Sequence, residues 1–231
     1  MAIKKGVYAA AMSIFNEDLS LDTDSTTKHI ERLIDEGCHA VAIFGSTGQG
    51  QLISTNEKKN LITKLGSSKL KDHFVIGTGS NSLNENINIM KHCINNGINR
   101  FLVMPPAYYK YGDSAVYAFF SNIIQKIPEV EIILYNFEKL CGYKFSVQII
   151  EKLVKDFPSQ ILGVKDSTYN LYETLKIPNF FIFPGSETKL LKGLEIGCSG
   201  VISAICNVTA PLARKVYDDF HSKKKQSLNN K

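Results

Sequence analysis

The sequence has few features of a secreted, membrane-spanning or zinc-binding protein. Its five cysteines are an odd number, form no CxxC pair and fit no zinc module, so we expect reduced, mostly buried thiols. No apolar run approaches the roughly 18 residues of a membrane-spanning helix, and no signal peptide precedes the first predicted strand. The protein is therefore predicted to be cytoplasmic and to make no contact with a membrane.

Signatures of phosphate, metal and nucleic-acid binding are missing as well. Neither the GxGxxG turn nor the P-loop pattern occurs, and the five scattered histidines accompany no HExxH, H-x-E or carboxylate cluster, so no metal site is expected. The formal net charge is +5, but four of these charges come from Lys223, Lys224, Lys225 and Lys231. We interpret residues 223–231 as a basic, disordered tail rather than as a nucleic-acid contact.

The rest of the chain alternates between two kinds of segment. Short, nearly continuous apolar runs are typical of parallel strands that are buried on both faces, and between them lie segments with helical spacing. The predicted strands are residues 6–14, 39–44, 74–79, 100–104, 131–135, 161–165, 180–184 and 200–205. The predicted helices are residues 24–36, 55–65, the segment opened by Ser82, 114–126, 146–156, 168–176, 187–196 and 208–221.

Eight strand–helix repeats predict a (β/α)8 TIM barrel in which residues 1–222 form one domain. A doubly wound sheet is the alternative, but it would usually have fewer strands and a glycine-rich phosphate turn. In a barrel, catalytic residues lie at the carboxyl ends of the strands and in the loops that follow them. Candidate residues are therefore sought at these positions.

Two candidate residues close neighbouring predicted strands, Tyr135 in IILYN and Lys165 in ILGVK. A lysine in a partly desolvated barrel mouth loses its proton more readily, and a Schiff-base nucleophile requires the neutral amine. A tyrosine beside it could transfer protons. Local sequence alone fits equally well a lysine that reaches solvent and a tyrosine that lines the barrel.

Three loops add candidate binding groups. The loop GSTGQG, residues 45–50, carries two hydroxyls and three glycines before a predicted helix, which favours an anion such as a 2-keto acid carboxylate; a glycine-rich turn before a capped helix is the alternative. Tyr108 in PPAYYKY could reach the site of its own or a neighbouring subunit, or pack in an interface. Gly185 in FPGSE and the run GVISAI suit a close approach of backbone to ligand, or a plain turn.

Taken together, these segments resemble the dihydrodipicolinate synthase / N-acetylneuraminate lyase family of Schiff-base-forming, pyruvate-dependent aldolases. The resemblance extends from residue 5 to about residue 220, with GSTG, a PxYY-type loop, YN, GVKD, PGSE and GVIS in the family's order. It implies that Lys165 is the Schiff-base lysine and that Tyr135 is the proton-shuttling tyrosine. It also implies that Ser46 and Thr47 hold the keto acid carboxylate and relay protons.

The resemblance implies further roles. Tyr108 would complete the proton relay in a neighbouring subunit, which implies a homo-oligomer, either a dimer or a tetramer. Gly48, Gly185 and Ile202 would line the substrate pocket. No metal or organic cofactor is implied, because the lysine imine itself serves as the electron sink.

Several departures from the family pattern bear on the substrate. Synthases that make dihydrodipicolinate carry an arginine for a second carboxylate in the segment that here reads EKLCG, and the matching residue is Leu140. Glu138 replaces the usual proline after YN. The continuation GQGQLISTNEKKNL reads closest to the sugar-acid aldolase branch. We also expect the barrel to lack the helical extension that family members usually carry after the eighth helix.

We therefore expect a lyase that cleaves or forms a C–C bond between pyruvate, held as a lysine enamine, and an aldehyde. The expected aldol is a 2-keto-3-deoxy sugar acid or a related hydroxylated 2-keto acid. The alternative is a 4-hydroxy-tetrahydrodipicolinate (dihydrodipicolinate) synthase, in which Lys139 would substitute for the missing arginine. A third reading is a barrel without activity that acts as a binding protein.

Overall fold

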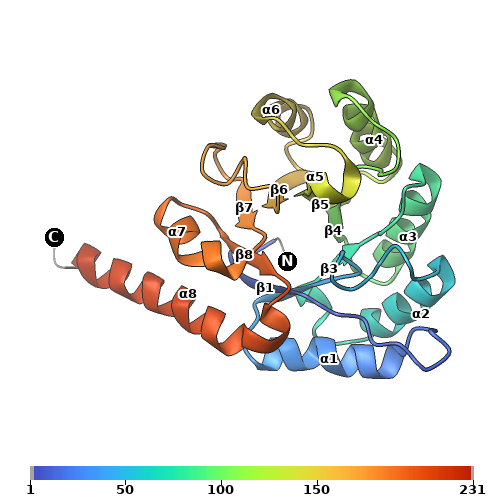
Figure 1. Ribbon diagram of the computed structural model, residues 1–231, viewed down its shortest axis with the longest axis horizontal. Coiled ribbons are helices and arrows are strands. Elements are labelled where there is room, and N and C mark those ends of the chain that lie inside the picture. The colour runs from blue at the N-terminus through green and yellow to red at the C-terminus, as the bar shows by residue number, and fades with distance from the viewer. Residues whose placement is uncertain (1–2, 230–231) are drawn as a thin grey trace.

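The computed structural model describes residues 3–229 and arranges eight parallel strands in a ring surrounded by helices (Figure 1). The strands follow the order β7-β6-β5-β4-β3-β2-β1-β8. Between β7 and β8 the ring is bridged by Ser199, whose N–H donates to the carbonyl of Ile182 at 2.8 Å. The predicted (β/α)8 TIM barrel is therefore confirmed.

Each predicted strand corresponds to an observed one. The strands are β1 (Gly6–Ala10), β2 (Ala40–Ile43), β3 (Phe74–Gly77), β4 (Arg100–Val103), β5 (Glu131–Asn136), β6 (Ile161–Asp166), β7 (Phe181–Pro184) and β8 (Gly200–Ser203). The helices are α1 (Thr23–Asp35), α2 (Thr55–Gly66), α3 (Leu83–Asn95), α4 (Asp113–Lys126), α5 (Glu138–Cys141), α6 (Val147–Asp156), α7 (Leu190–Glu195) and α8 (Cys206–Asn229), with 3-10 turns at η1 (Lys71–His73) and η2 (Glu187–Lys189).

Two helices begin where side-chain caps were visible in the sequence. At α2, the Ser54 side chain accepts from the Glu57 N–H while the Glu57 carboxylate accepts from the Ser54 N–H, which is a complete capping box. At α3, the Ser82 side chain accepts from the N–H of Glu85. These caps satisfy N–H groups that have no partner within the first turn of a helix.

The apolar residues divide into two layers, because successive side chains of a barrel strand point alternately outward and inward. The outward layer packs the strands against the surrounding helices. The inward layer fills the ring, and it includes residues of seven strands together with one residue that precedes β1. Its buried members are Ile3, Tyr8, Ala10, Ala40, Ala42, Val75, Leu102, Ile133, Tyr135, Phe183 and Ile202.

The helix predicted over residues 168–176 does not form. The chain instead makes bends and turns after β6, and the carboxylate of Asp166 accepts the backbone N–H groups of Thr168, Tyr169, Leu171 and Tyr172. Tyr169 has a φ of 63°, and a right-handed helix needs a φ near −60°. The prediction was wrong because a buried carboxylate organises this segment. No helix was predicted for the short α5.

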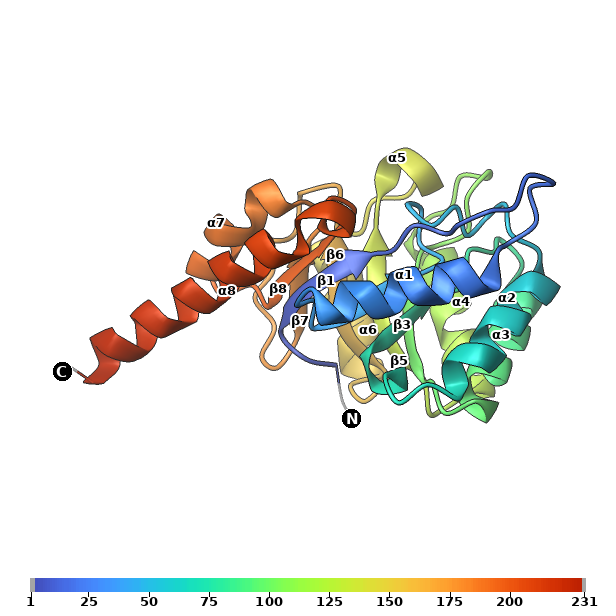
Figure 2. The same ribbon diagram turned by 90° about the horizontal axis from the view of Figure 1, so that it is seen from below.

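Helix α8 leaves the barrel and projects from it at its far end (Figure 2). Its backbone is helical as far as Asn229, whereas we expected a disordered tail from residue 223 onward. The side chains of residues 223–231 and the backbone of residues 230 and 231 lie outside the described part of the structure. Within residues 3–229, no helix has both the length and the apolar character needed to cross a membrane.

Candidate active site

Lys165 and Tyr135 face each other inside the carboxyl end of the barrel. They are direct register partners on the parallel strands β6 and β5, and each is only 4% exposed. The Lys165 Nζ lies 4.4 Å from the centroid of the Tyr135 ring. The amine and the phenol ring that the sequence predicted as partners are therefore adjacent in a desolvated environment.

Ser46 joins this pair from the loop after β2. Its Oγ lies 2.9 Å from the Tyr135 phenol oxygen, close enough for a hydrogen bond in which either hydroxyl donates. Thr47 is half-buried, and in the described part of the chain its hydroxyl has no hydrogen-bond partner. The structure thus brings Ser46 to Tyr135, and Thr47 lies next to it along the loop.

The sequence suggested that a helix directly follows the loop 45–50, but the structure has none there. Helix α2 begins at Thr55 with Ser54 as its N-cap, so the helix dipole lies several residues away. The N–H groups of Gln49 and Gly50 donate within the loop. Those of Ser46, Thr47 and Gly48 have no acceptor among the described residues, and consecutive N–H groups of this kind form an anion-binding concavity.

A cavity of about 260 Å³ opens beside Ser46 and Tyr135. Its lining includes apolar residues such as Leu102, Met104 and Leu140 and neutral amides such as Gln51 and Asn81. Among the described residues that line this cavity, none carries a charge. The cavity therefore suits a neutral, hydroxylated group better than a second carboxylate.

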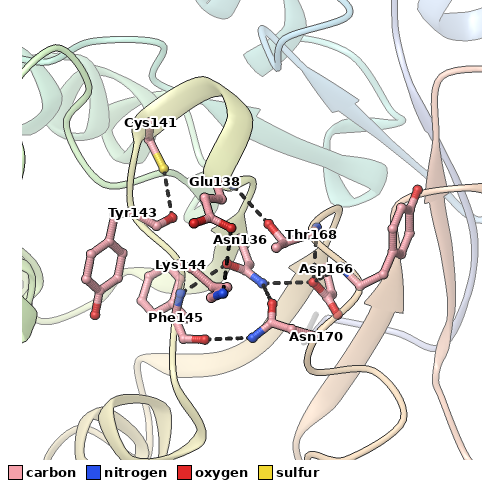
Figure 3. Close-up of polar contacts among 10 residues, drawn as sticks. Asn136, Glu138, Cys141, Tyr143, Lys144, Phe145, Asp166, Thr168 and Asn170 are labelled. Carbon is pink, nitrogen blue, oxygen red and sulfur yellow. Dashed lines mark hydrogen bonds and ion pairs between the residues drawn. The ribbon is translucent and has the colours of Figure 1, made fainter.

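A buried polar network joins Asn136, Asp166 and Asn170 (Figure 3). It fixes the strand ends one residue beyond Tyr135 and Lys165. Asn136 and Asp166 are the next register pair and are fully buried. The Asn136 amide nitrogen donates to Asp166 Oδ1 at 2.8 Å and to Asn170 Oδ1 at 2.8 Å, and its oxygen accepts the N–H of Phe145 at 3.1 Å. The network therefore holds the two strands in one register at the point where the amine meets the phenol.

Sequence reasoning missed Asp166. An acidic residue inside an apolar strand end, directly after the candidate lysine, was the available signal. Its carboxylate accepts four backbone N–H groups and one amide, which is how a buried charge is satisfied without a cation. Asp166 therefore positions the site and does not itself face the cavity.

The family model of the dihydrodipicolinate synthetase family matches residues 4–230. The chain belongs to this family. It is 28% identical over 228 residues to an uncharacterized DapA-like lyase of Chloroflexus aurantiacus, with 96% of this chain and 76% of that relative covered. It is 29% identical over 220 residues to an N-acetylneuraminate lyase of Actinobacillus pleuropneumoniae, with 92% and 74% covered.

A solved structure is also similar. The structure of YagE, a prophage protein of E. coli K12 that belongs to the dihydrodipicolinic acid synthase family and was solved in complex with pyruvate, superposes with a TM-score of 0.86. The identity is 24%, and the superposition covers 96% of this chain and 77% of YagE. The resemblance drawn from the sequence is confirmed, and the protein is a lyase of the dihydrodipicolinate synthetase family.

Gly185 and Ile202 also lie at the carboxyl end of the barrel of this family member. A Cβ at Gly185 would lie 2.1 Å from Ser167 Oγ, so a larger residue there would require the Ser167 side chain to move. Ile202 is fully buried in the inward layer on β8. Gly48 has a similar constraint, since its Cβ would lie 2.7 Å from the carbonyl oxygen of Ala11.

Tyr108 does not reach the site of its own chain. It is 89% exposed and has a φ of 81°. Its ring packs edge-on against Tyr109, with the centroids 5.0 Å apart. Its role in a neighbouring subunit of a family oligomer stays a prediction.

One buried lysine near the site was not anticipated. Lys58 on α2 is 3% exposed, and its Nζ donates to the carbonyl of Thr78, a residue that lines the cavity, at 2.8 Å. Burial lowers the pKa of Lys58 to about 8, and the nearby Glu85 offsets part of this effect. Within residues 3–229, no group of three or more His, Cys, Asp or Glu side chains could hold a metal ion.

Proposed function

We propose that the protein is a Schiff-base aldolase that cleaves or forms the C–C bond between pyruvate and an uncharged, hydroxylated aldehyde. The aldol would be a 2-keto-3-deoxy sugar acid or a related hydroxylated 2-keto acid. The observation that carries this proposal is the position of the Lys165 amine, buried and 4.4 Å from the ring of Tyr135. Its register partner Tyr135 thus carries a phenol, which can exchange protons with an imine or an alkoxide.

The reaction would begin when the neutral Lys165 amine attacks the C2 ketone of the keto acid. Loss of water from the carbinolamine gives an imine, and the protonated imine withdraws electrons from C3. In cleavage, Tyr135 takes the proton of the C4 hydroxyl as the C3–C4 bond breaks, and the aldehyde leaves. The remaining enamine is protonated at C3, and water then releases pyruvate and the free amine.

The substrate carboxylate would bind at the loop after β2. The N–H groups of Ser46, Thr47 and Gly48 and the hydroxyls of Ser46 and Thr47 offer donors to it. This contact would hold C2 within reach of Lys165, which favours the attack by removing translational and rotational freedom. The bound carboxylate would then lie beside the Ser46–Tyr135 hydroxyl pair.

The absence of charge along the described cavity wall favours a neutral aldehyde. An aldehyde with its own carboxylate would be bound best by a guanidinium, and Leu140 occupies the matching position on α5. Under the alternative, a dihydrodipicolinate synthase, the exposed Lys139 of the same helix would have to supply the charge. We also propose a dimer or tetramer, in which the exposed Tyr108 would complete the proton relay of the neighbouring subunit's site.

Borohydride trapping with pyruvate, read by intact mass, tests the chemistry. We expect an adduct with the wild type and with Lys155→Ala, which removes an exposed lysine of α6, and none with Lys165→Ala. Absence of an adduct on the folded wild type would rule out both aldolase readings and favour a barrel without activity. Turnover with aspartate semialdehyde but not with glyceraldehyde would instead support the dihydrodipicolinate synthase.

A further inference from the structure

The segment 11–14, which follows β1, contacts the loop to which the proposed function assigns the substrate carboxylate. The Ser13 hydroxyl donates to the carbonyl oxygen of Gly48 at 2.6 Å. A Cβ at Gly48 would lie 2.7 Å from the Ala11 carbonyl oxygen and 3.2 Å from Ser13 Oγ, so the segment and the loop are closely packed. Ser13 is not among the described residues that line the cavity. Any effect of Ser13 on the site is therefore transmitted through the loop.

The backbone on both sides of Ser13 is held by helices. The Met12 N–H donates to Asn207 Oδ1 on α8 at 3.0 Å. The Ile14 N–H donates to Thr26 Oγ1 on α1 at 3.0 Å. Both acceptor residues are buried. Because its two neighbours are bonded to buried groups, Ser13 has a fixed place beside the loop.

Asn207 is itself fixed by several hydrogen bonds. Its amide nitrogen donates to the carbonyls of Ala10 at 2.7 Å and Ala204 at 2.6 Å. Its amide oxygen, which accepts the Met12 N–H, also lies 2.8 Å from Nε2 of the buried His29. Asn207 therefore joins the end of β1 to α1 and α8, and it gives the segment that carries Ser13 a rigid support.

The peptide between Gly48 and Gln49 has an orientation that the Ser13 bond maintains. The N–H of this peptide donates to the Ser46 carbonyl at 3.1 Å, and its carbonyl accepts the Ser13 hydroxyl. Gln49 has a φ of 50°, which residues with a Cβ seldom adopt, and reversal of the peptide plane would return φ to the ordinary negative range. Gly48 has no Cβ to oppose that reversal. The Ser13 hydroxyl opposes it, because the buried Gly48 carbonyl would lose its donor.

Reversal of this peptide would disrupt the carboxylate site. The Gly48 carbonyl oxygen would replace the Gln49 N–H opposite the Ser46 carbonyl, and two acceptors would then face each other. The turn that arranges the N–H groups of Ser46, Thr47 and Gly48 would open as a result. An anion binds such a concavity only when its N–H groups point to one place.

We propose that Ser13 is a positioning residue for the substrate carboxylate. By holding the Gly48 carbonyl, its hydroxyl preserves the turn whose N–H groups bind the anion. Ser13 thus favours the binding of charged 2-keto acids without contact with the reacting atoms. This inference rests on the proposed function.

Borohydride trapping at increasing ketone concentration tests this role with pyruvate and with methyl pyruvate, an ester without the negative charge. In Ser13→Ala we expect the half-saturating concentration of pyruvate to rise by about tenfold, the upper end of the factor that one hydrogen bond contributes. The maximal trapping rate and the half-saturating concentration of methyl pyruvate should stay near the wild-type values. Ser13→Thr, which keeps the hydroxyl, should bind pyruvate as the wild type does.

Thr27→Val is the matched control. Thr27 is buried on α1, and its hydroxyl donates to the carbonyl of Thr23 at 2.7 Å. The variant therefore also removes one bond between a hydroxyl and a backbone carbonyl, but within a helix and away from the loop. It should match the wild type for both ketones.

Two outcomes would overturn the role of Ser13. One is an unchanged half-saturating concentration of pyruvate in Ser13→Ala, and the other is an equal rise for pyruvate and methyl pyruvate, which would indicate a general loosening of the barrel mouth. If Ser13→Ala did not fold, Ser13→Cys, which keeps the shape with a weaker donor, would be judged by the same two outcomes. Both outcomes leave the Schiff-base proposal in place. A wild type that forms no adduct would instead remove the proposed function, and the role of Ser13 with it.

Discussion

At the carboxyl end of the barrel, every polar side-chain atom of the register pair Asn136 and Asp166 has a hydrogen-bond partner. At the amino end, the register pair Arg100 and Glu131 contains the two buried side-chain atoms that lack a partner in the described part of the chain, Arg100 Nε and Glu131 Oε2. The amino-end pair points into the ring, two residues before the inward-facing Leu102 and Ile133, whereas the carboxyl-end pair points outward, one residue after Tyr135 and Lys165. A fully paired network enforces one geometry, whereas a partly paired one does not.

This difference indicates that the two ends of the barrel have different roles. The carboxyl-end network lies directly behind Tyr135 and Lys165, where a small displacement would separate the amine from the phenol. The amino-end pair has no reacting group beside it, and Arg100 instead bonds the carbonyl of Asp72 and forms an ion pair with the Asp72 carboxylate at 3.3 Å. We expect substitutions at the first end to change the chemistry and those at the second to change only stability.

The largest effect is expected for Tyr135→Phe. Loss of the phenol should lower kcat by roughly 10²–10⁴-fold, the usual contribution of a positioned acid–base group. The ring is kept, so it still packs against Phe137 at a centroid distance of 5.9 Å and the melting temperature should change little. Steady-state aldol cleavage measures the effect.

Tyr143→Phe is the matched control for this prediction. Tyr143 is a buried tyrosine of the outward layer, and its phenol donates to Asp113 Oδ1 at 2.7 Å. Its loss should change stability and leave kcat unchanged. If the two variants had the same kcat, Tyr135 would not be the proton-transfer group.

The next largest effect is expected for Asp166→Asn. The amide nitrogen cannot accept the N–H groups that one carboxylate oxygen accepts now, so the strand ends should shift relative to each other. A misplacement of about 1 Å can lower kcat about 10²-fold. Trapping rates with pyruvate, measured well below the unfolding transition, test this, and Asp219→Asn on the exposed face of α8 is the control. A wild-type trapping rate in Asp166→Asn would mean that the network stabilises the fold without positioning the amine.

The sequence predicted most strands and helices because the patterns that indicate them are local. Apolar runs and helical spacing are visible in short stretches of sequence, and the capping box of Ser54 and Glu57 lies within four residues. The pairing of Tyr135 with Lys165 was expected from the rule that barrel sites lie at the carboxyl ends of strands and from the resemblance to the family. The distance between the Lys165 amine and the Tyr135 ring, and the register of their strands, are known only from the structure.

The failures of prediction involve contacts between distant segments. The turn after β6 exists because Asp166 captures the N–H groups that follow it, and Asn136 reaches that carboxylate from a strand 30 residues earlier. Apolar spacing over residues 168–176 contains no sign of this bond. Tyr169 is a similar case, because its backbone strain comes from the same capture and is not encoded in its residue type.

A smaller effect, on stability alone, is expected for Arg100→Met. The substitution removes donors to the carbonyls of Lys71 and Asp72, and a buried group left without its partner costs about 1–3 kcal/mol. Denaturant unfolding should register this loss in the free energy of unfolding, while kcat of the folded enzyme stays at the wild-type value. A parallel loss of kcat would contradict the division between the two ends of the barrel.

The smallest effect is expected for the pH dependence that Lys58 contributes. This lysine lies near the carboxyl end but outside the ring, on α2. Because burial lowers its pKa from 10.5 to about 8, the unfolded chain binds more protons than the folded chain between these pH values. Stability contributed by this residue therefore rises with pH across that window, and the burial penalty is fully present below it.

Lys58→Met removes this titrating group, so the difference between the wild type and the variant isolates its contribution to stability. Between pH 8 and about pH 9.5, the wild type should gain about 1–2 kcal/mol of unfolding free energy relative to Lys58→Met. Lys69→Met, which removes an exposed lysine, should follow the wild type at each pH. If the difference between wild type and Lys58→Met did not vary with pH, Lys58 would act as Arg100 does, as a fixed donor to a backbone carbonyl. In that case, the contrast between paired and unpaired groups would apply only to the residues of the strands.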